Sequence, residues 1–320
     1  MNPFEYVNPR TVNSAVAEVA NKGCFFAGGI DVLGEMKEYI AQPRRLVNVK
    51  ELPGLGDITR GKDQWTVGAN VAVAELENDA EVKNVFPGLQ QAAAEVGSLQ
   101  IRNVATVGGN LAQHSRCWYY RHRDIRCLKR GGSTCYARDG ENKYHSLFSG
   151  NPCISPVVSN LAIALAALDA KVIVRRGRED VPLTIPEFYA KAWDNPEAHH
   201  SLASTDLILR VEIPNSSRKS AYLQMSEKAS FDWALVSCAA AAKVDGHKLS
   251  QVRVVLGAIS PVPHQVPAAH ELLDGKELDD ELASRAADAI LKDAEPFAHN
   301  GYKVPIAHAL VRRTLKQLLV

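Results

Sequence analysis

Apolar and polar residues alternate along the first hundred positions with the spacing of short helices and strands. Apolar residues three and four apart predict a helix over 11–23 that ends on Gly23, and the run CFFA predicts a strand at 24–27. Further elements are predicted in the order helix, strand, strand, helix at 31–40, 44–50, 64–71 and 71–85. A helix, a break and a pair of glycines occupy 86–111. The pattern predicts a mixed α/β unit.

Residues 114–155 differ in kind, because they are rich in Arg, Tyr, Cys, Gly and Ser and show almost no periodicity. Unstructured stretches of this length within a domain are uncommon and usually functional. A bound metal would supply the order that a hydrophobic face does not.

The periodic pattern resumes after residue 155. It predicts a helix at 160–170 and strands at 171–176 and 207–214. From about residue 215 we expect two strands, a helix, a strand and closing helices, the last at 279–294 and 304–319. This order predicts a separate α+β domain. We therefore expect domains at 1–214, with 114–155 inserted, and at 215–320.

Composition narrows the class of protein. Hydrophobic residues make up 46% and charged residues 23%, which is typical of soluble globular chains. The net charge of +1 favours neither nucleic acid nor a membrane surface as a partner. No apolar run approaches the roughly 20 residues that cross a bilayer, so no membrane insertion is expected. The N-terminus has no signal-peptide pattern. We expect a cytoplasmic protein, unless a partner with an export signal carries it out.

Two glycine pairs are candidate phosphate-binding turns. Gly28 and Gly29 separate a predicted strand from a predicted helix, and ATVGGNLAQ holds the second pair beside Asn110 and Gln113. Backbone N–H groups in such turns can surround a phosphate, although either pair alone reads as an ordinary turn. Neither matches the G-x-G-x-x-G dinucleotide motif, which disfavours a Rossmann fold. One globular unit can bring both turns to one diphosphate.

Four of the six cysteines fall within 37 residues, at Cys117, Cys127, Cys135 and Cys153. Four thiolates can bind zinc or an iron–sulfur cluster. The absence of C-x-x-C pairs favours the cluster, while zinc, disulfides and unrelated free thiols stay open. Disulfides are disfavoured in a chain without a signal peptide. Basic residues crowd the stretch and would offset the charge of thiolates: Arg116, Arg121, Arg123, Arg126, Lys129 and Arg130.

The remaining candidate ligands have simpler explanations. Cys24 and Cys238 lie in apolar runs and are expected to be buried as small hydrophobic residues. Three histidines flank the cysteines. We expect these histidines to be solvent-exposed loop residues, although each could instead be a substitute ligand: His114, His122 and His145.

These motifs together resemble the FAD-binding subunits of the xanthine oxidase family of molybdenum hydroxylases. FFAGGIDVLGEMK is similar to that family's first flavin loop and ATVGGNL to its second. VRVVLGAISPVPHQV resembles the start of its carbon-monoxide-dehydrogenase-type C-terminal domain, and YKVPIAHALVRRTLKQLL its closing helix. The resemblance runs in order from about residue 3 to 319. It implies an α+β fold, with a two-part FAD-binding domain of the vanillyl-alcohol oxidase type before the C-terminal domain.

The cysteine insertion resembles one subgroup, the flavin subunits of 4-hydroxybenzoyl-CoA reductase and of bacterial molybdenum aldehyde dehydrogenases. NLAQHSRCWYY, RCLKRGGSTCYA and NPCIS match it at all four cysteines. This resemblance implies that Cys117, Cys127, Cys135 and Cys153 ligate a 4Fe–4S cluster. It implies that the FAD diphosphate is bound by the backbone of Ala27, Gly28, Gly29, Ile30 and Asp31, continued by Val32 and Leu33. Flavin contacts are implied at Thr106, Gly109 and Asn110.

Two positions depart from the family pattern. Asn160 stands where the family commonly has an Asp near the flavin, and Gln224 where it has a Lys. An amide hydrogen-bonds but carries no charge, so the flavin potential is expected to differ. Asn160 and Gln224 are retained as candidate flavin contacts.

The resemblance implies an oxidoreductase subunit that transfers electrons and leaves substrate chemistry to a partner. The implied partners are a large molybdopterin-binding subunit and a small subunit with two 2Fe–2S clusters, with ferredoxin or another soluble carrier outside. A stand-alone FAD oxidoreductase of the same flavin fold is an alternative, as is a zinc-binding protein without redox chemistry or a non-redox nucleotide-binding module.

Overall fold

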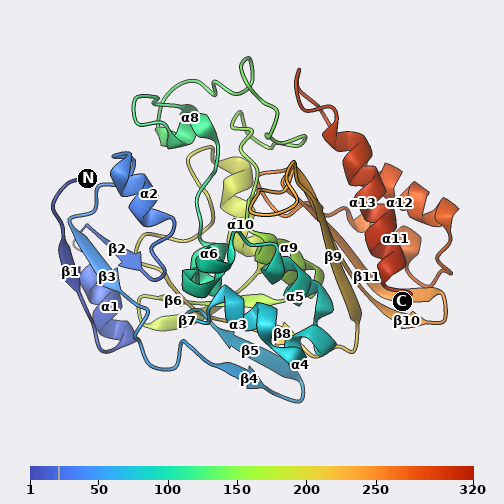
Figure 1. The fold of residues 1–320 in the computed structure, drawn as a ribbon, viewed down its shortest axis with the longest axis horizontal. Helices are drawn as coiled ribbons and strands as arrows, with labels where there is room; N and C mark the ends of the chain where they lie inside the picture. The colour runs from blue at the N-terminus through green and yellow to red at the C-terminus, as the bar shows by residue number, and fades with distance from the viewer. Residues whose placement is uncertain (21) are drawn as a thin grey trace.

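The computed structural model describes residues 1–20 and 22–320 (Figure 1), so Asn21, within the helix predicted at 11–23, lies outside the described residues. The chain begins with a small parallel sheet of order β1-β3-β2. Its elements are β1 (Glu5–Val7), α1 (Val12–Val19), β2 (Gly23–Phe26), α2 (Val32–Lys37) and β3 (Arg45–Asn48). Thr11 and Ser14 form a capping box that starts α1. The helix ends at Val19, and Gly23 opens β2 instead of closing α1.

A five-stranded antiparallel sheet of order β4-β5-β8-β6-β7 forms the middle of the molecule. Its strands are β4 (Ile58–Arg60), β5 (Gln64–Gly68), β6 (Lys171–Arg176), β7 (Glu179–Thr184) and β8 (Leu207–Pro214). The associated helices are α3 (Val73–Asn78), α4 (Ala80–Val85), α5 (Pro87–Ala94), α6 (Leu99–Val104), α7 (Val107–Leu111), α9 (Asn160–Ala167) and α10 (Ile185–Asp194). The single helix predicted over 71–85 is two helices, because Asp79 has an extended backbone and its carboxylate caps α4.

The last third of the chain forms an antiparallel sheet of order β11-β10-β9, and closing helices cover it (Figure 1). Its elements are β9 (Lys219–Met225), β10 (Val236–Asp245), β11 (Lys248–Gly257), α11 (Pro267–Leu273), α12 (Asp280–Leu291) and α13 (Lys303–Gln317). Within 219–257, all described, no helix interrupts the strands, so the helix expected among them is wrong. The alanine run 239–242 is buried in the central strand, where small side chains let α9 and α13 pack closely.

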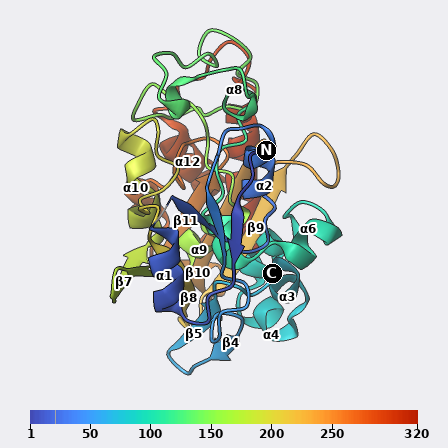
Figure 2. The ribbon, with the colours of Figure 1, turned by 90° about the vertical axis from the view of Figure 1, so that its left-hand side faces the viewer.

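Helix α9 joins the middle and C-terminal sheets. Every residue from Leu161 to Ala167 is buried, and the helix packs on α5, β10 and β11. Residues 114–155, called the cysteine segment below, lie at one end of the molecule in both views (Figures 1 and 2). As expected, the segment is almost free of regular structure, with only α8 (Trp118–Arg121) and a short 3₁₀ turn, η1 (Leu128–Arg130). Among the described residues, no helix has the length and apolarity to cross a bilayer.

Candidate functional site

A cavity of about 570 Å³ lies where the β2–α2 loop, α6, α7 and the start of β8 meet. This volume is within the range of cofactor-binding pockets. Most of the predicted binding residues line it: Ala27, Gly28, Gly29, Ile30, Asp31, Val32, Thr106, Gly109, Asn110 and Asn160. We call it the large cavity.

The first glycine pair lets the β2–α2 loop touch the end of α6 at the large cavity. A Cβ atom at Gly28 would lie 2.3 Å from the carbonyl oxygen of Val104, far inside van der Waals contact. Gly29 has a φ of +71°, a left-handed conformation that glycine adopts at little cost. The loop therefore requires glycine at both positions, once for space and once for backbone shape.

The second glycine pair is not a turn. Gly108 and Gly109 lie within α7, and the Thr106 hydroxyl accepts a 3.1 Å hydrogen bond from Gly109 N at its start. Asn110 is held from the other side, because the Ser159 hydroxyl donates to its Oδ1 at 2.6 Å. Gly108 packs on Ala69, so this pair serves close helix packing as well as the cavity wall.

Two predicted contacts lie off the cavity wall. Leu33 lies beside Gly29. Gln224 binds the neighbouring groups instead: its Oε1 accepts from Asn160 Nδ2 at 3.2 Å, and its Nε2 donates to the Glu95 carboxylate at 2.9 Å. Glu95 does line the cavity, and burial raises its pKa. A carboxylate from α5's end thus lies beside the two amides that depart from the family pattern.

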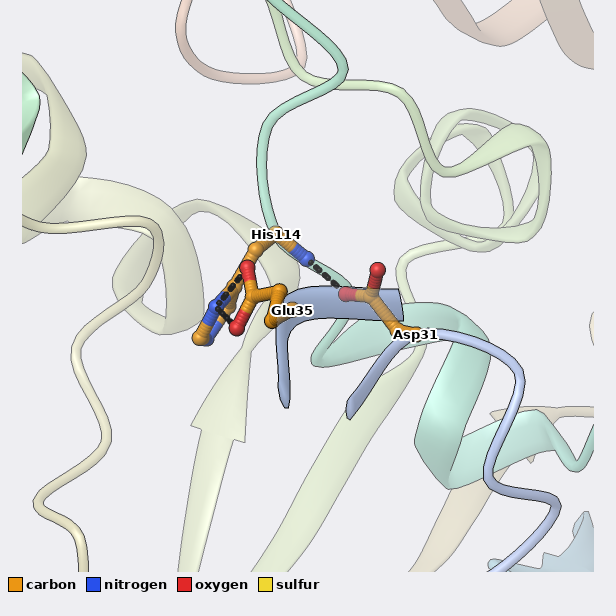
Figure 3. A group of neighbouring side chains, drawn as sticks. All are labelled: Asp31, Glu35 and His114. Atoms are coloured by element: carbon orange, nitrogen blue, oxygen red, sulfur yellow. Dashed lines mark hydrogen bonds and ion pairs between the residues drawn. The ribbon is translucent and has the colours of Figure 1, made fainter. Parts of the chain in front are cut away.

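A charged cluster links the β2–α2 loop to the cysteine segment. The Asp31 carboxylate accepts from the guanidinium groups of Arg116 and Arg121, the latter at 2.6 Å, and from His114 N at 2.7 Å. Burial opposes ionisation of Asp31, but the two arginines and the His114 N–H outweigh it and lower its pKa. Figure 3 shows Asp31 and Glu35, from α2's start, meeting His114.

Glu35 continues this cluster inward. Its carboxylate contacts His114 Nδ1 at 3.0 Å and accepts from the Tyr120 hydroxyl at 2.8 Å. Ligand atoms of Asp31, Glu35 and His114 lie within 4.8 Å of one another, close enough for a metal ion. However, the arginines already pair with both carboxylates, at 2.6 Å on Asp31 and 3.6 Å on Glu35, so the trio acts as an ion-pair cluster.

The four clustered cysteines line one small cavity, which we call the cysteine cavity. Cys127 and Cys153 are buried, and Cys117 and Cys135 are half-buried. Cys117 follows the ion-pair cluster directly, and its N–H donates to Ser115 Oγ at 3.0 Å. The expectation that the two other cysteines are buried is correct for Cys238, in β10, but Cys24 is only half-buried and lies on the wall of the large cavity.

The thiols of Cys135 and Cys153 are close enough to hydrogen-bond, but the four thiols do not form the compact group that a single zinc ion binds. Zinc–thiolate bonds of about 2.3 Å in a tetrahedron place the sulfurs about 3.8 Å apart. Among the described residues, no three of these thiols lie within 4.8 Å of one another. Four thiols around one cavity are a donor set that an iron–sulfur cluster could use, and their spacing is wider than one zinc ion requires.

The expectation of solvent-exposed histidines is correct only for His122. His145 is 2% exposed, and its Nε2 lies 3.1 Å from Cys117 Sγ. His114 is half-buried against Glu35. Burial and the charge of Lys303 lower the pKa of His145 to about 4. The sequence shows no periodicity around His145, so nothing there indicated that the C-terminal domain covers it.

Most of the basic residues near the cysteines serve other partners. Arg116 and Arg121 bind Asp31, and Arg130 donates to three backbone carbonyls of 122–125. Lys129 donates to the Ala198 carbonyl at 2.8 Å, but it is buried, lines the cysteine cavity and interacts electrostatically with all four cysteines. The general expectation of charge compensation therefore reduces to this residue.

Sequence reasoning missed two stretches of the large cavity. Residues 202–204 and 206–208, before and within β8, form one side, and the 231–233 loop of the C-terminal domain forms the rim. Trp233 is 51% exposed there, and the Arg116 guanidinium lies 4.9 Å from its ring centroid. The SFDW tetrapeptide in a polar loop was the available signal.

Comparison with known proteins shows the family to which the chain belongs. Residues 2–216 match the family model described as the FAD binding domain in molybdopterin dehydrogenase, and 220–318 match the CO dehydrogenase flavoprotein C-terminal domain. The chain belongs to this flavoprotein family. It is an FAD-binding oxidoreductase subunit, which confirms the coarser resemblance inferred from the two glycine segments.

Similar flavoproteins match nearly end to end. The chain is 31% identical to the aldehyde oxidoreductase FAD-binding subunit of Escherichia coli K12, covering 99% of this chain and 96% of that protein. It is 24% identical to the carbon monoxide dehydrogenase medium chain of Hydrogenophaga pseudoflava, covering 98% and 96%. The structure of that dehydrogenase superposes with a TM-score of 0.77 at 23% identity, covering 98% and 96% of the chains. Quinoline 2-oxidoreductase from Pseudomonas putida 86 gives 0.77 at 21%, covering 99% and 97%. These likenesses confirm the fold class.

Proposed function

We propose that this chain is the electron-transfer subunit of a heterotrimeric molybdenum hydroxylase and holds both FAD and a 4Fe–4S cluster. The observation that carries the proposal is the convergence of Cys117, Cys127, Cys135 and Cys153 on one cavity next to the flavin-binding domain's charged cluster. Tyr120 lines the cysteine cavity, and its hydroxyl bonds to Glu35, which lines the large cavity. One side-chain contact thus spans the two sites.

The residues of the large cavity would hold FAD by backbone and amide contacts. Backbone N–H groups of 27–31, continued by Val32 and Leu33, would bind the diphosphate, with Thr106, Gly109 and Asn110 on the opposite wall. Asn160 would contact the flavin directly. Gln224, which is itself bonded to Glu95, would orient the Asn160 amide. When bound, FAD exchanges electrons singly or in pairs, whereas an iron–sulfur cluster exchanges one.

The fit of the cysteine cavity rests on the chemistry of its donors. Four thiols and a buried lysine without a carboxylate partner among the described ion pairs suit an anionic cluster. The spacing of the thiols argues against zinc. Lys129 would offset the negative charge of the ligated thiolates.

The proposed partners and the proposed cellular location are those expected for the family. We propose a large molybdopterin-binding subunit, which performs the substrate chemistry, and a small subunit with two 2Fe–2S clusters. A soluble one-electron carrier such as ferredoxin would exchange electrons at the exposed side of the cysteine segment, and the assembly would be cytoplasmic. The adjoining family matches at 216 and 220 support a division into domains 1–214 and 215–320.

Anaerobic purification with flavin extraction and metal analysis tests the proposal. We expect about one FAD and four iron atoms per chain, with broad visible absorbance from the cluster. Cys135→Ser should lose iron and keep FAD, whereas Cys238→Ala, in the core of β10, should keep both. FAD with zinc, or FAD without metal, would refute the cluster and leave a flavin subunit. Zinc without FAD would refute the whole proposal.

A further inference from the structure

Beside the four cysteines, the cysteine cavity contains one imidazole. His145 lines the cavity, is 2% exposed, and brings Nε2 to 3.1 Å from Cys117 Sγ. The position is held by backbone contacts: His145 N donates to Asn142 O at 2.9 Å, and Asn300 Nδ2 donates to the carbonyl of His145 at 3.3 Å. These two bonds hold the backbone of His145 in place beside the cavity.

The surroundings of the ring assign its proton. Among the described residues, Nδ1 of His145 is buried and has no hydrogen-bond partner. A proton on Nδ1 would be a buried, unsatisfied donor, and the Nε2 lone pair would face the sulfur lone pairs of a thiolate. A proton on Nε2 instead donates to the thiolate, which accepts it readily. The tautomer with Nε2–H is therefore the one that this site stabilises.

We propose that His145 donates an N–H···S hydrogen bond from Nε2 to Cys117 and raises the reduction potential of the cluster. This inference rests on the proposed function, since it requires the cluster. Hydrogen bonds to ligating sulfurs stabilise the added electron, because reduction increases the negative charge that the donor faces. His145 is a positioning residue: it acts through the Cys117 thiolate and contributes no bond to iron.

Redox titration of the full chain, purified with any partners it carries and followed by electron paramagnetic resonance, tests the role of His145. His145→Leu removes the donor at similar volume, and we expect a lower cluster potential with four iron atoms retained. A tenfold loss of preference for the reduced cluster corresponds to about 59 mV in a one-electron couple. His145→Gln keeps an N–H donor and should restore part of the shift. His122→Leu, at an exposed histidine of the same segment, should shift nothing.

The outcomes separate this inference from the proposed function. Four iron atoms with an unchanged potential in His145→Leu would overturn the hydrogen bond. Loss of one iron atom in that variant would overturn it too, because His145 would then be a ligand. If the variant does not fold, pulsed resonance on wild-type protein with ¹⁵N-labelled histidine decides: a weak coupling supports the donor, and no coupling or a strong one refutes it. Wild-type protein without iron would refute the proposed function, and this inference with it.

Discussion

Replacing Asp31 with Asn tests how strongly the β2–α2 loop is tied to the cysteine segment. The carboxylate accepts two guanidinium donors and one backbone N–H, and both arginines and Asp31 are 20% exposed. Hydrogen bonds to a charged group contribute about 1.5–3 kcal/mol each. Breaking a fully buried pair costs about 3–5 kcal/mol. Because these partners are partly exposed and Asn keeps one acceptor oxygen, we expect Asp31→Asn to lower the free energy of unfolding by about 2–3 kcal/mol.

A double-mutant cycle isolates the ion pair from the rest of the change. Asp31→Asn, Arg121→Met and their combination would be compared by chemical denaturation, with a coupling energy of about 1–2 kcal/mol expected. Asp124→Asn is the matched control, since Asp124 is 77% exposed and 3.7 Å from Arg123. It should leave stability unchanged. A coupling energy below about 0.5 kcal/mol, the range of exposed pairs, would refute the reasoning.

The same variant has a defined pH dependence. The folded pKa of Asp31 is lowered, so its ionic contribution is complete above the unfolded pKa of about 3.9 and is lost as pH falls through the folded pKa. The stability difference between wild type and Asp31→Asn should therefore be constant near neutral pH and shrink below about pH 4. A difference that grew on acidification would contradict the assignment of Asp31 as the ionised acceptor.

Two further changes probe the wall and rim of the large cavity, and a third probes α6, which contributes Ile101 to its lining. Gly28→Ala places a methyl group against the Val104 carbonyl and should lower the FAD-to-protein ratio after gel filtration, whereas Gly34→Ala, with no atom within 4 Å of its added Cβ, should not. Trp233→Ala removes the stacking with Arg116, which contributes about 0.5–1 kcal/mol at exposed sites. We expect FAD release, followed by flavin fluorescence, to become about two- to fivefold faster. An unchanged release rate would show that the rim of the cavity does not retain the cofactor. Arg102→Met leaves the Glu77 carboxylate without its 2.6 Å partner and should cost about 3 kcal/mol of unfolding free energy; a loss under 1 kcal/mol would show that α6 is held by other contacts.

Local sequence patterns account for most of the correct predictions. Helical spacing located α1, α9, α12 and α13 because their apolar faces are buried. The first glycine pair was identifiable because a strand, two glycines and a helix leave few backbone arrangements. The cysteines grouped correctly because only one segment is rich in them and poor in apolar residues.

The errors share a cause in long-range contacts. The alanine run of β10 favours a helix by intrinsic propensity, but pairing with β9 and β11 sets its strand conformation. Gly108 and Gly109 resemble a turn, yet packing on Ala69 and the Thr106 cap make them helical. The sequence around His145 is typical of an exposed loop, but residues more than 150 positions later in the chain bury it.

The contacts of the cysteine segment determine when in biosynthesis it can be completed. Asn142 Oδ1 accepts from His299 N, Asn300 reaches the carbonyls of His145 and Ser146, and Tyr302 bonds to Lys143 O. These C-terminal residues emerge from the ribosome long after the four cysteines. The thiols are therefore presented without their final cover throughout most of synthesis. Binding of the proposed cluster would therefore follow translation, and the four thiols of a ribosome-bound chain stalled before residue 295 should react freely with alkylating reagents.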